Sequence, residues 1–226
     1  KTKAIVLCSP SNPSGKVFSK KEIEVISKIC NENNIIIITD EIYEYFIYDH
    51  HKHISPGSLD YNLDNTITIS GYSKTFSITG WRIGYVACKK EWAQLIGYVS
   101  DLIYVCAPTP FQIAVAEGIY NIHNSFYESL RKQFQILRDD LCETLISVGL
   151  KPIIPQGSYY ILADASKLEA KTSKEKAMLI LNKTGVATVP GSAFYKSRIG
   201  EKYVRFCFSV EDHILHKACS RIKKLV

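Results

Sequence analysis

Residues 35–43 read Ile35-Ile-Ile-Ile-Thr-Asp40-Glu-Ile-Tyr43, and this stretch indicates the fold class. Four consecutive isoleucines predict a buried strand, and the polar residues that follow mark its carboxyl end. An earlier apolar run, Ala4–Cys8, predicts a neighbouring buried strand, and between the two lies a helical pattern that opens with the capping box Ser19-Lys-Lys-Glu22. Apolar runs that alternate with amphipathic helices are typical of a parallel sheet covered by helices, so we expect an α/β fold.

The same alternation continues to residue 125. A polar loop over residues 48–65 leads to a third predicted strand, Thr66–Ser70, and the run Ile83–Ala87 predicts a fourth. Helices are predicted over residues 91–104 and 108–122, the second entered through two prolines. Residues 1–125 are therefore predicted to form one domain, a mostly parallel sheet sandwiched by helices.

The pattern changes after residue 125. A long amphipathic helix is predicted over residues 126–148, and after Gly149 the sequence pattern changes to strand candidates around a helix. The further elements predicted there are strands over 158–162, 186–189 and 203–208 and helices over 173–183 and 210–225. Residues 126–226 are therefore predicted to form a smaller α+β domain, connected by the long helix.

Composition and charge limit the classes of partner. The chain has 226 residues and a net charge of +6, from 28 Lys and Arg against 22 Asp and Glu. The basic residues recur beside acidic or helical neighbours, which is typical of solvated helix faces and argues against a nucleic-acid partner. The longest uncharged stretch, residues 102–116, is shorter than the roughly 18 apolar residues of a membrane span and contains prolines, so we expect no membrane segment.

The cysteines indicate the redox environment. There are seven, none in a Cys-x-x-Cys pair, and several lie in apolar runs. An odd number of unpaired cysteines in such runs predicts reduced, buried thiols in a cytoplasmic protein.

Polar residues follow the predicted strands at one edge of the sheet. Ligands of open parallel sheets bind beyond the carboxyl ends of the strands. Asn12, Asp40, Tyr43 and Lys74 come directly after strands, and Arg82 lies eight residues beyond the lysine. A lysine that is partly desolvated beside a cation is activated as a Schiff-base nucleophile, although an arbitrary lysine is usually a surface residue.

Five blocks of sequence together carry a family resemblance. They are Asn12-Pro-Ser-Gly15, Asp40-Glu-Ile-Tyr43, Ser73-Lys74-Thr-Phe-Ser-Ile-Thr-Gly-Trp-Arg82-Ile-Gly-Tyr85, Val189-Pro-Gly-Ser-Ala-Phe194 and Tyr203-Val-Arg205-Phe-Cys-Phe-Ser209. In order and spacing they resemble the signature series of the class I/II pyridoxal-phosphate-dependent aminotransferases of fold type I, the aspartate aminotransferase superfamily. The resemblance covers nearly the whole chain and implies that fold, with residues 1–125 as part of the large cofactor-binding domain.

The resemblance implies catalytic roles for three residues. Lys74 would form a Schiff base with pyridoxal 5'-phosphate and later move a proton on the substrate. Asp40 would face the pyridine nitrogen and keep it protonated, because an adjacent anion favours the charged form. Tyr43, together with Asn12 as a cofactor ligand, would hydrogen-bond the phenolate oxygen of the ring.

The resemblance implies binding roles for three more. Arg82 would pair bidentately with the cofactor phosphate, and Ser73 would donate its hydroxyl to the same group. Many family members carry a second phosphate hydroxyl three residues before the lysine, where this chain has Gly71. Arg205 would grip the α-carboxylate of the substrate.

Each of these residues also has a purely structural alternative. Asp40 could cap a strand, Tyr43 and Arg82 could serve in packing or ion pairing, Asn12 could form a turn, and Arg205 could be an exposed strand charge. The ordered set around Lys74 favours function over these alternatives.

The resemblance also bears on the whole protein. It implies a cytoplasmic homodimer of amino-acid metabolism that moves an amino group between an amino acid and a 2-oxo acid, with aspartate, aromatic, kynurenine and diaminopimelate substrates all open. It implies as well that the family's N-terminal part is missing here, so that the fragment alone is expected to bind the cofactor weakly or be inactive. The alternatives are a carbon–sulfur lyase or cyclopropane-forming synthase of the same fold, and a non-catalytic regulatory domain.

Some histidines and tyrosines have weaker signals. His50-His51-Lys-His53 has the residue type of a metal site, but a single loop with no second cluster is interpreted as solvated. His213 and His216 are likewise interpreted as a helix face, so no metal is expected. Tyr159-Tyr160 lies where the family often lines its substrate pocket, and core packing explains the pair equally well.

Overall fold

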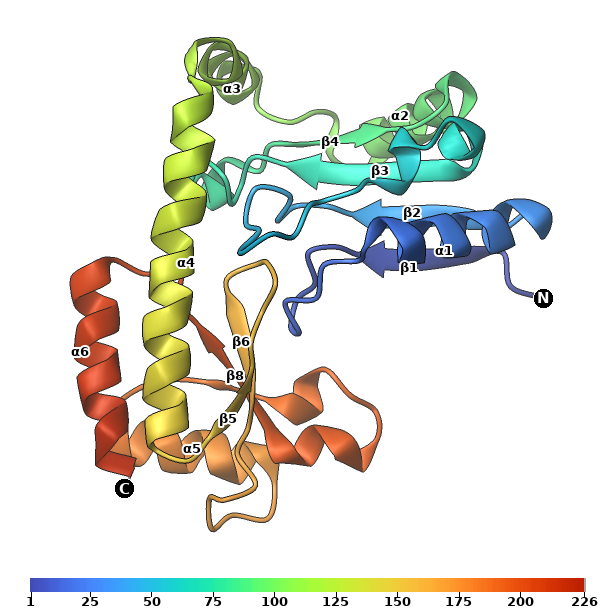
Figure 1. Ribbon diagram of the computed structural model, residues 1–226. Helices are drawn as coiled ribbons and strands as arrows, with labels where there is room; N and C mark the ends of the chain where they lie inside the picture. The colour runs from blue at the N-terminus through green and yellow to red at the C-terminus, as the bar shows by residue number, and fades with distance from the viewer. Residues whose placement is uncertain (226) are drawn as a thin grey trace. The chain divides into compact units, whose positions relative to one another are not determined.

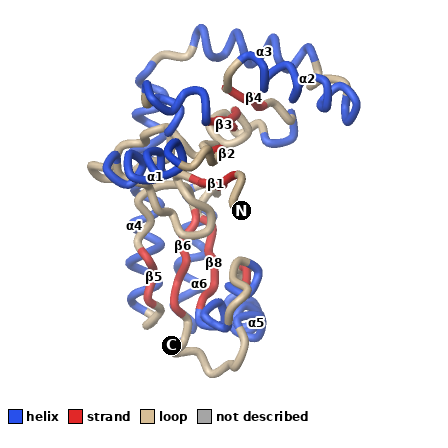
Figure 2. The backbone as a smooth tube through the Cα atoms, turned by 90° about the vertical axis from the view of Figure 1, so that its right-hand side faces the viewer, coloured by secondary structure: helices blue, strands red, loops and turns tan. Residues whose placement is uncertain are grey.

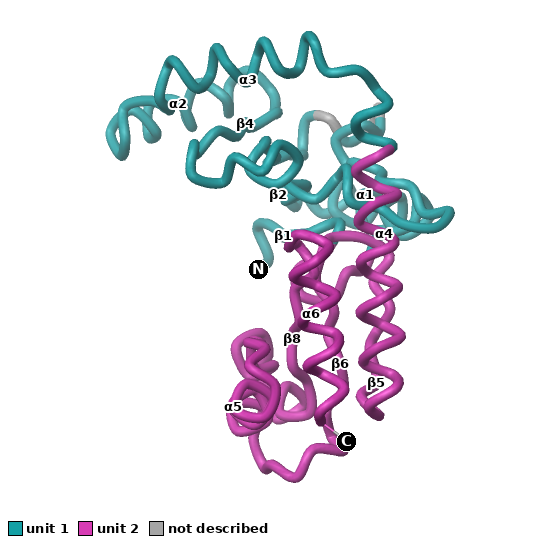
Figure 3. Tube along the Cα trace, turned by 90° about the vertical axis from the view of Figure 1, so that its left-hand side faces the viewer, with its two compact units in different colours: residues 1–10, 17–128 teal, residues 11–16, 129–226 magenta. Residues whose placement is uncertain are grey.

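The computed structural model describes residues 1–225, with the side chains of all of them except Asp60, Tyr61 and Leu63. By its internal contacts the chain divides into two compact units (Figure 3). Unit 1 comprises residues 1–10 and 17–128, and unit 2 comprises residues 11–16 and 129–226.

Unit 1 is built on a four-stranded sheet. Its strands, in the order in which they pair, are β1 (Ala4–Cys8), β2 (Ile36–Asp40), β3 (Thr66–Gly71) and β4 (Gly84–Ala87). The first three are parallel and β4 is antiparallel to β3, so the prediction of a mostly parallel sheet is confirmed (Figure 1). The antiparallel return means that the segment between β3 and β4 turns back at the same sheet edge where β2 ends.

Helix α1 (Lys20–Glu32) covers one face of this sheet (Figure 1). The predicted capping box is present: the Glu22 N–H donates to Ser19 Oγ at 3.3 Å, and the Ser19 N–H donates to Glu22 Oε2 at 2.8 Å. Cys30 of the helix packs with Leu7 and Ile37 of the strands. The prediction that the strands are buried is wrong for β1, because Val6 points away from α1 and is 71% exposed.

The remaining elements of unit 1 are helices. They are the short 3₁₀ turns η1 (Pro56–Ser58), η2 (Asp60–Asn65) and η3 (Thr79–Trp81) and the α-helices α2 (Lys90–Tyr104) and α3 (Thr109–Asn121). The loop predicted over residues 48–65 is thus partly 3₁₀. It is held by buried Asn62, whose amide donates to Ser27 Oγ at 3.1 Å and Thr66 Oγ1 at 3.0 Å.

Unit 2 contains an antiparallel sheet in the order β5-β6-β8-β7, with α-helices and short 3₁₀ helices among its described residues. In chain order the elements are α4 (Asn124–Ser147, entering from unit 1), β5 (Lys151–Ile153), β6 (Tyr160–Asp164), α5 (Ser173–Thr184), β7 (Val189–Pro190), η4 (Gly191–Ala193), η5 (Arg198–Lys202), β8 (Tyr203–Cys207), α6 (Asp212–Ile222) and η6 (Lys223–Leu225). Figure 2 shows β6 and β8 side by side, with the register Leu162 opposite Arg205. Strand β5 was not predicted from the sequence. The strand predicted over 186–189 is reduced to Val189–Pro190, because its pairing with β8 is limited to two residues.

The seven cysteines are all free. Cys30, Cys142 and Cys219 are buried as predicted, whereas Cys106 and Cys207 are exposed, so the prediction of burial is wrong for these two. Among the described residues, no helix is long and apolar enough to cross a membrane.

Candidate active site

Asp40 lies at the carboxyl end of β2. It pairs in register with Cys8 of β1 and Ile69 of β3, which fixes the backbone on both sides. The carboxylate oxygen Oδ1 accepts a hydrogen bond from the Ile42 N–H at 3.2 Å. The side chain is partly buried and lines a pocket at this end of the sheet.

The segment between β3 and β4 carries Lys74. The Phe76 N–H donates to the Tyr72 carbonyl at 3.1 Å, which closes a tight turn around the lysine, and Thr79 Oγ1 donates to the Ser73 carbonyl at 2.9 Å. The strands flanking this turn approach closely, because a Cβ added at Gly71 would lie 2.8 Å from the Gly84 Cα. Only glycine permits that approach, which returns the chain to the sheet edge.

Arg82 closes the same segment. Its backbone is left-handed, with φ of 57°, and its Nη1 donates to the Thr79 carbonyl at 2.9 Å. A left-handed conformation is uncommon for a residue with a side chain, and such strain occurs often at functional sites. The guanidinium is exposed and thus accessible to an anion.

These residues line one pocket of about 310 Å³. Four of the predicted site residues contribute to it, namely Asp40, Ser73, Lys74 and Arg82. An amine, a carboxylate, a guanidinium and a hydroxyl therefore surround a single space. Tyr43 does not line this pocket: it is 5% exposed and packs edge-on against Phe46, with ring centroids 6.3 Å apart.

The other two predicted residues belong to unit 2, where they meet each other. Arg205 Nη1 donates to Asn12 Oδ1 at 2.8 Å. The Arg205 Cζ also lies 4.1 Å from the ring centroid of Tyr160 and 4.8 Å from that of Phe194. The hydrogen-bonded pair is separated by 193 positions in the sequence, and both residues belong to unit 2.

Comparison with known proteins identifies the family. The family model described as aminotransferase class I and II matches residues 1–222, nearly the whole chain. The chain belongs to the class I and II aminotransferases. This establishes the family and its fold type I, as the sequence motifs predict.

Individual aminotransferases are similar to the chain over part of their length. Human kynurenine–oxoglutarate transaminase 1 is 34% identical over 99% of this chain, and aspartate aminotransferase of Pyrococcus abyssi is 38% identical over 100% of it. Among solved structures, N-succinyldiaminopimelate aminotransferase from Mycobacterium tuberculosis superposes with a TM-score of 0.94 at 32% identity, covering 100% of this chain and 59% of that one. The chain spans 58% of the length of each of the two curated relatives.

The pocket fits the cofactor that the aminotransferase family generally uses. Pyridoxal phosphate offers an aldehyde, a ring nitrogen and a phosphate. An amine condenses with the aldehyde, and a carboxylate pairs with the protonated ring nitrogen. A guanidinium together with a hydroxyl binds the phosphate. Lys74, Asp40 and the pair Arg82 and Ser73 supply these groups within one space.

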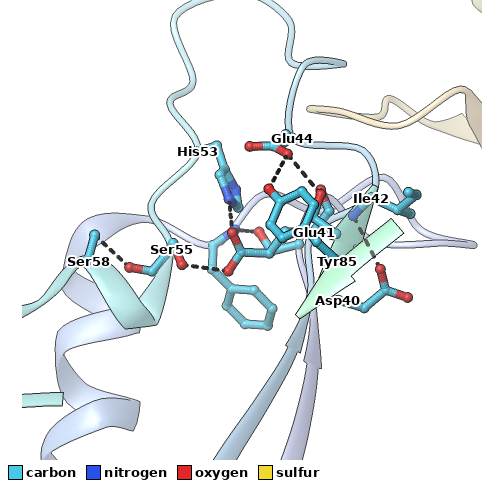
Figure 4. A network of polar contacts seen from close by, with 11 residues as sticks. Asp40, Glu41, Ile42, Glu44, His53, Ser55, Ser58 and Tyr85 are labelled. Carbon is cyan, nitrogen blue, oxygen red and sulfur yellow. Dashed lines mark hydrogen bonds and ion pairs between the residues drawn. The ribbon is translucent and has the colours of Figure 1, made fainter. Parts of the chain in front are cut away.

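A second polar cluster lies next to Asp40 along the chain and was not predicted (Figure 4). The Glu41 carboxylate, 4% exposed, meets His53 Nε2 at 2.7 Å and accepts from Ser55 Oγ at 2.7 Å. Figure 4 shows the Asp40 and Glu41 carboxylates pointing in different directions, as alternation predicts when it continues one residue past the end of β2. This alternation is the signal that could have assigned Glu41 a partner of its own.

His53 therefore corrects the interpretation of its loop. The side chain of His53 is only 14% exposed, so it is not solvated, whereas His50 and His51 are exposed. Within the described part of the chain, no group of three or more potential ligands could hold a metal ion. The histidine instead satisfies a buried carboxylate, which would cost several kcal/mol if left unpaired.

Glu44 extends this cluster toward the sheet. Ser70 Oγ donates to Glu44 Oε1 at 2.8 Å, and Tyr85 Oη approaches the same oxygen at 3.5 Å (Figure 4). Burial raises the pKa of Glu44 above the ordinary value of 4.5, and the nearby Glu41 carboxylate raises it further, while Ser70 and His53 lower it. The folded state therefore favours the protonated form of Glu44 more than the unfolded chain does.

Replacing Glu44 by glutamine is expected to raise the melting temperature at neutral pH. The pKa of Glu44 is raised in the folded state, so below pH 4.5 the ionisation of Glu44 does not lower the free energy of unfolding. As the pH rises through the folded pKa, ionisation lowers the free energy of unfolding progressively. Solvent screening at this partly exposed site limits the gain to about 2 °C. Thermal unfolding of Glu44→Gln and the parent chain between pH 4 and 8 measures it, with Glu128→Gln, at an exposed residue of α4, as the control. A Glu44→Gln difference that stays constant, or shrinks, as the pH rises contradicts the prediction.

Proposed function

We propose that this protein is a pyridoxal-phosphate-dependent aminotransferase that moves an amino group between an amino acid and a 2-oxo acid. The observation that carries the proposal is the pocket at the ends of β2 and β3, where Lys74, Asp40 and Arg82 line one space. Membership of the class I and II aminotransferases supports the same activity. The names of the relatives suggest aspartate, kynurenine and N-succinyldiaminopimelate as substrates to test.

Two residues carry the proton chemistry in this proposal. Pyridoxal phosphate, when bound, supplies an electron sink for negative charge at the substrate Cα. The Lys74 amine would hold the cofactor covalently and, when free, move a proton at that carbon. The Asp40 carboxylate would keep a proton on the ring nitrogen, because an adjacent anion favours the charged form of the ring.

Other residues of the chain would bind and orient. The Arg82 guanidinium suits a phosphate because its donors match two oxygens at once, and the Ser73 hydroxyl would add a further donor. For Tyr43 and Asn12 the proposal rests on the family motif, which assigns them hydrogen bonds to the ring hydroxyl oxygen. Neither residue lines the pocket of unit 1.

Arg205 is proposed to bind the α-carboxylate of the substrate. Its only hydrogen bond among the described residues goes to a neutral amide oxygen, that of Asn12, and none of the described carboxylates forms an ion pair with it. Its Nε is buried without a hydrogen-bond partner in the described part of the chain. A carboxylate would both balance the charge and use the planar fork of donors, which lysine lacks.

We extend the proposal to a cytoplasmic homodimer. The outer surfaces of α2 and α3 expose large apolar side chains, among them Leu102 at 86% and Tyr120 at 89%. Exposed apolar patches of this kind mark interaction surfaces, which supports association with another chain. Seven free cysteines support a reducing compartment.

Transfer of the amino group tests the proposed function. The intact protein, rather than residues 1–226 alone, is supplied with pyridoxal phosphate, each candidate amino acid and 2-oxoglutarate, and glutamate formation is followed. We expect glutamate to appear with at least one donor and with ping-pong kinetics. Release of pyruvate and ammonia from an amino acid in the absence of any 2-oxo acid, with no glutamate formed, would overturn transamination in favour of a lyase.

A further inference from the structure

Arg205 lies against two aromatic rings within unit 2. Its Cζ is 4.1 Å from the Tyr160 ring centroid and 4.8 Å from the Phe194 ring centroid. Both distances are within the range of a cation–π interaction, in which the negative face of a ring attracts the guanidinium. Two rings at such distances limit both the rotation of the guanidinium and the directions from which an anion reaches it.

The guanidinium has an unsatisfied binding capacity. Only one of its donors is accounted for by Asn12, at 2.8 Å, and the buried Nε has no partner among the described residues. A buried donor without an acceptor costs free energy, and a guanidinium that no anion balances costs more. The arrangement therefore holds a cation ready for an anion rather than serving the stability of unit 2.

Both rings rest on rigid supports. Tyr160 lies in β6, which pairs with the β8 strand of Arg205, and its ring contacts that of Tyr159 at a centroid distance of 4.8 Å. Phe194 follows the η4 turn, where the Ser192 N–H donates to Ser173 Oγ of α5 at 3.1 Å. Tyr160 is thus held by strand pairing, and Phe194 follows a turn that is hydrogen-bonded to α5.

We propose that Tyr160 and Phe194 are positioning residues that orient the Arg205 guanidinium for the α-carboxylate of the substrate. The inference rests on the proposed function and deepens it. A long arginine side chain loses conformational entropy when it binds a ligand. Rings that already restrict its rotamers in the free protein reduce that entropy loss. The rings also cover part of the guanidinium, and a less polar surrounding strengthens its hydrogen bonds to a carboxylate.

Kinetics of ring-removing and ring-keeping variants test this proposal. Tyr160→Leu and Phe194→Leu are each expected to raise KM for both the amino acid and the 2-oxo acid about 5- to 20-fold, with kcat changed less than about twofold. Tyr160→Phe and Phe194→Tyr keep a ring at each position and are expected to keep KM near that of the parent chain. Tyr195→Leu is the matched control, because the Tyr195 ring stacks on Tyr203 at 6.1 Å rather than on the guanidinium.

A binding measurement decides the same question without catalysis. The NMR resonance of the Arg205 Nε–H is followed in the cofactor-free protein while propionate, a simple monocarboxylate, is added. We expect a response in the parent chain and in Tyr160→Phe, and about 5- to 20-fold more propionate for the same response in the leucine variants. Unchanged KM and unchanged propionate response in both leucine variants would overturn the positioning role. If no variant transfers amino groups, the proposed function fails, and the propionate titration still decides the role of the rings.

Discussion

Replacement of Lys74 by arginine is expected to abolish covalent attachment of pyridoxal phosphate and amino-group transfer together. Arginine keeps the positive charge in the pocket beside Asp40 and Arg82. A guanidinium stays protonated, however, and therefore does not form a Schiff base with the aldehyde of the cofactor. Transfer is expected to fall by about 10⁴-fold or more, because one group supplies both the anchor and the proton transfer. Borohydride reduction followed by mass spectrometry of the peptide containing residue 74 measures the attachment independently of activity.

The control is Lys89→Arg, at a lysine that lies over the Trp92 ring 4.6 Å away and outside the pocket. This variant is expected to keep the label on residue 74 and to keep its activity. A Lys74→Arg chain that is still labelled, at another lysine, and still transfers amino groups contradicts the assignment.

Local signals in the sequence predicted most of the fold. The helix after Ser19 begins where the capping box places it, with both reciprocal hydrogen bonds formed. The isoleucine run becomes β2, and its polar end carries Asp40 to the sheet edge. Such features depend on residues within one turn or one strand of each other, so a single sequence contains them.

Features that depend on distant partners could not be predicted in this way. Nothing in the Ile83–Ala87 run tells whether it pairs parallel or antiparallel with β3, because the apolar pattern is the same for both. The short strand β5 has only three residues, Lys151–Ile153, and exists through its pairing with β6. Burial of the strands was overestimated for the same reason, since it depends on what covers each face of the sheet.

In the candidate site too, the local features were predicted from the sequence and the long-range contacts were not. The motif blocks predicted the residue types of the pocket, and the turn between β3 and β4 brings Lys74 and Arg82 to Asp40. His53 was interpreted as a solvated histidine because its partner, Glu41, lies 12 residues away in the sequence. Glu41 also follows Asp40 directly, and the motif gave it no role of its own. The contact of Arg205 with Tyr160 and Phe194 likewise joins β8 to residues that the motif pattern treats separately.

Replacing Asp40 by asparagine is expected to reduce kcat by about 10²- to 10⁴-fold while the fold is retained. Asparagine has nearly the same shape, and its side-chain oxygen can still accept the hydrogen bond that the Ile42 N–H donates to Oδ1 at 3.2 Å. What is lost is the negative charge that would keep the ring nitrogen protonated. Rapid-mixing kinetics measure kcat, and titration with pyridoxal phosphate is expected to show weaker binding as well.

The neighbouring substitution Glu41→Gln gives the opposite pattern and serves as the control. Glu41 is buried and bonded to His53 and Ser55 and does not line the pocket, so its substitution is expected to lower the melting temperature and leave kcat nearly unchanged. Two adjacent carboxylates then act on different quantities, one on the reaction and the other on stability, because successive side chains at the end of a strand point to different sides. If Asp40→Asn lowered the melting temperature without changing kcat or cofactor affinity, Asp40 would be a structural residue like its neighbour, and the cofactor would need another counter-charge.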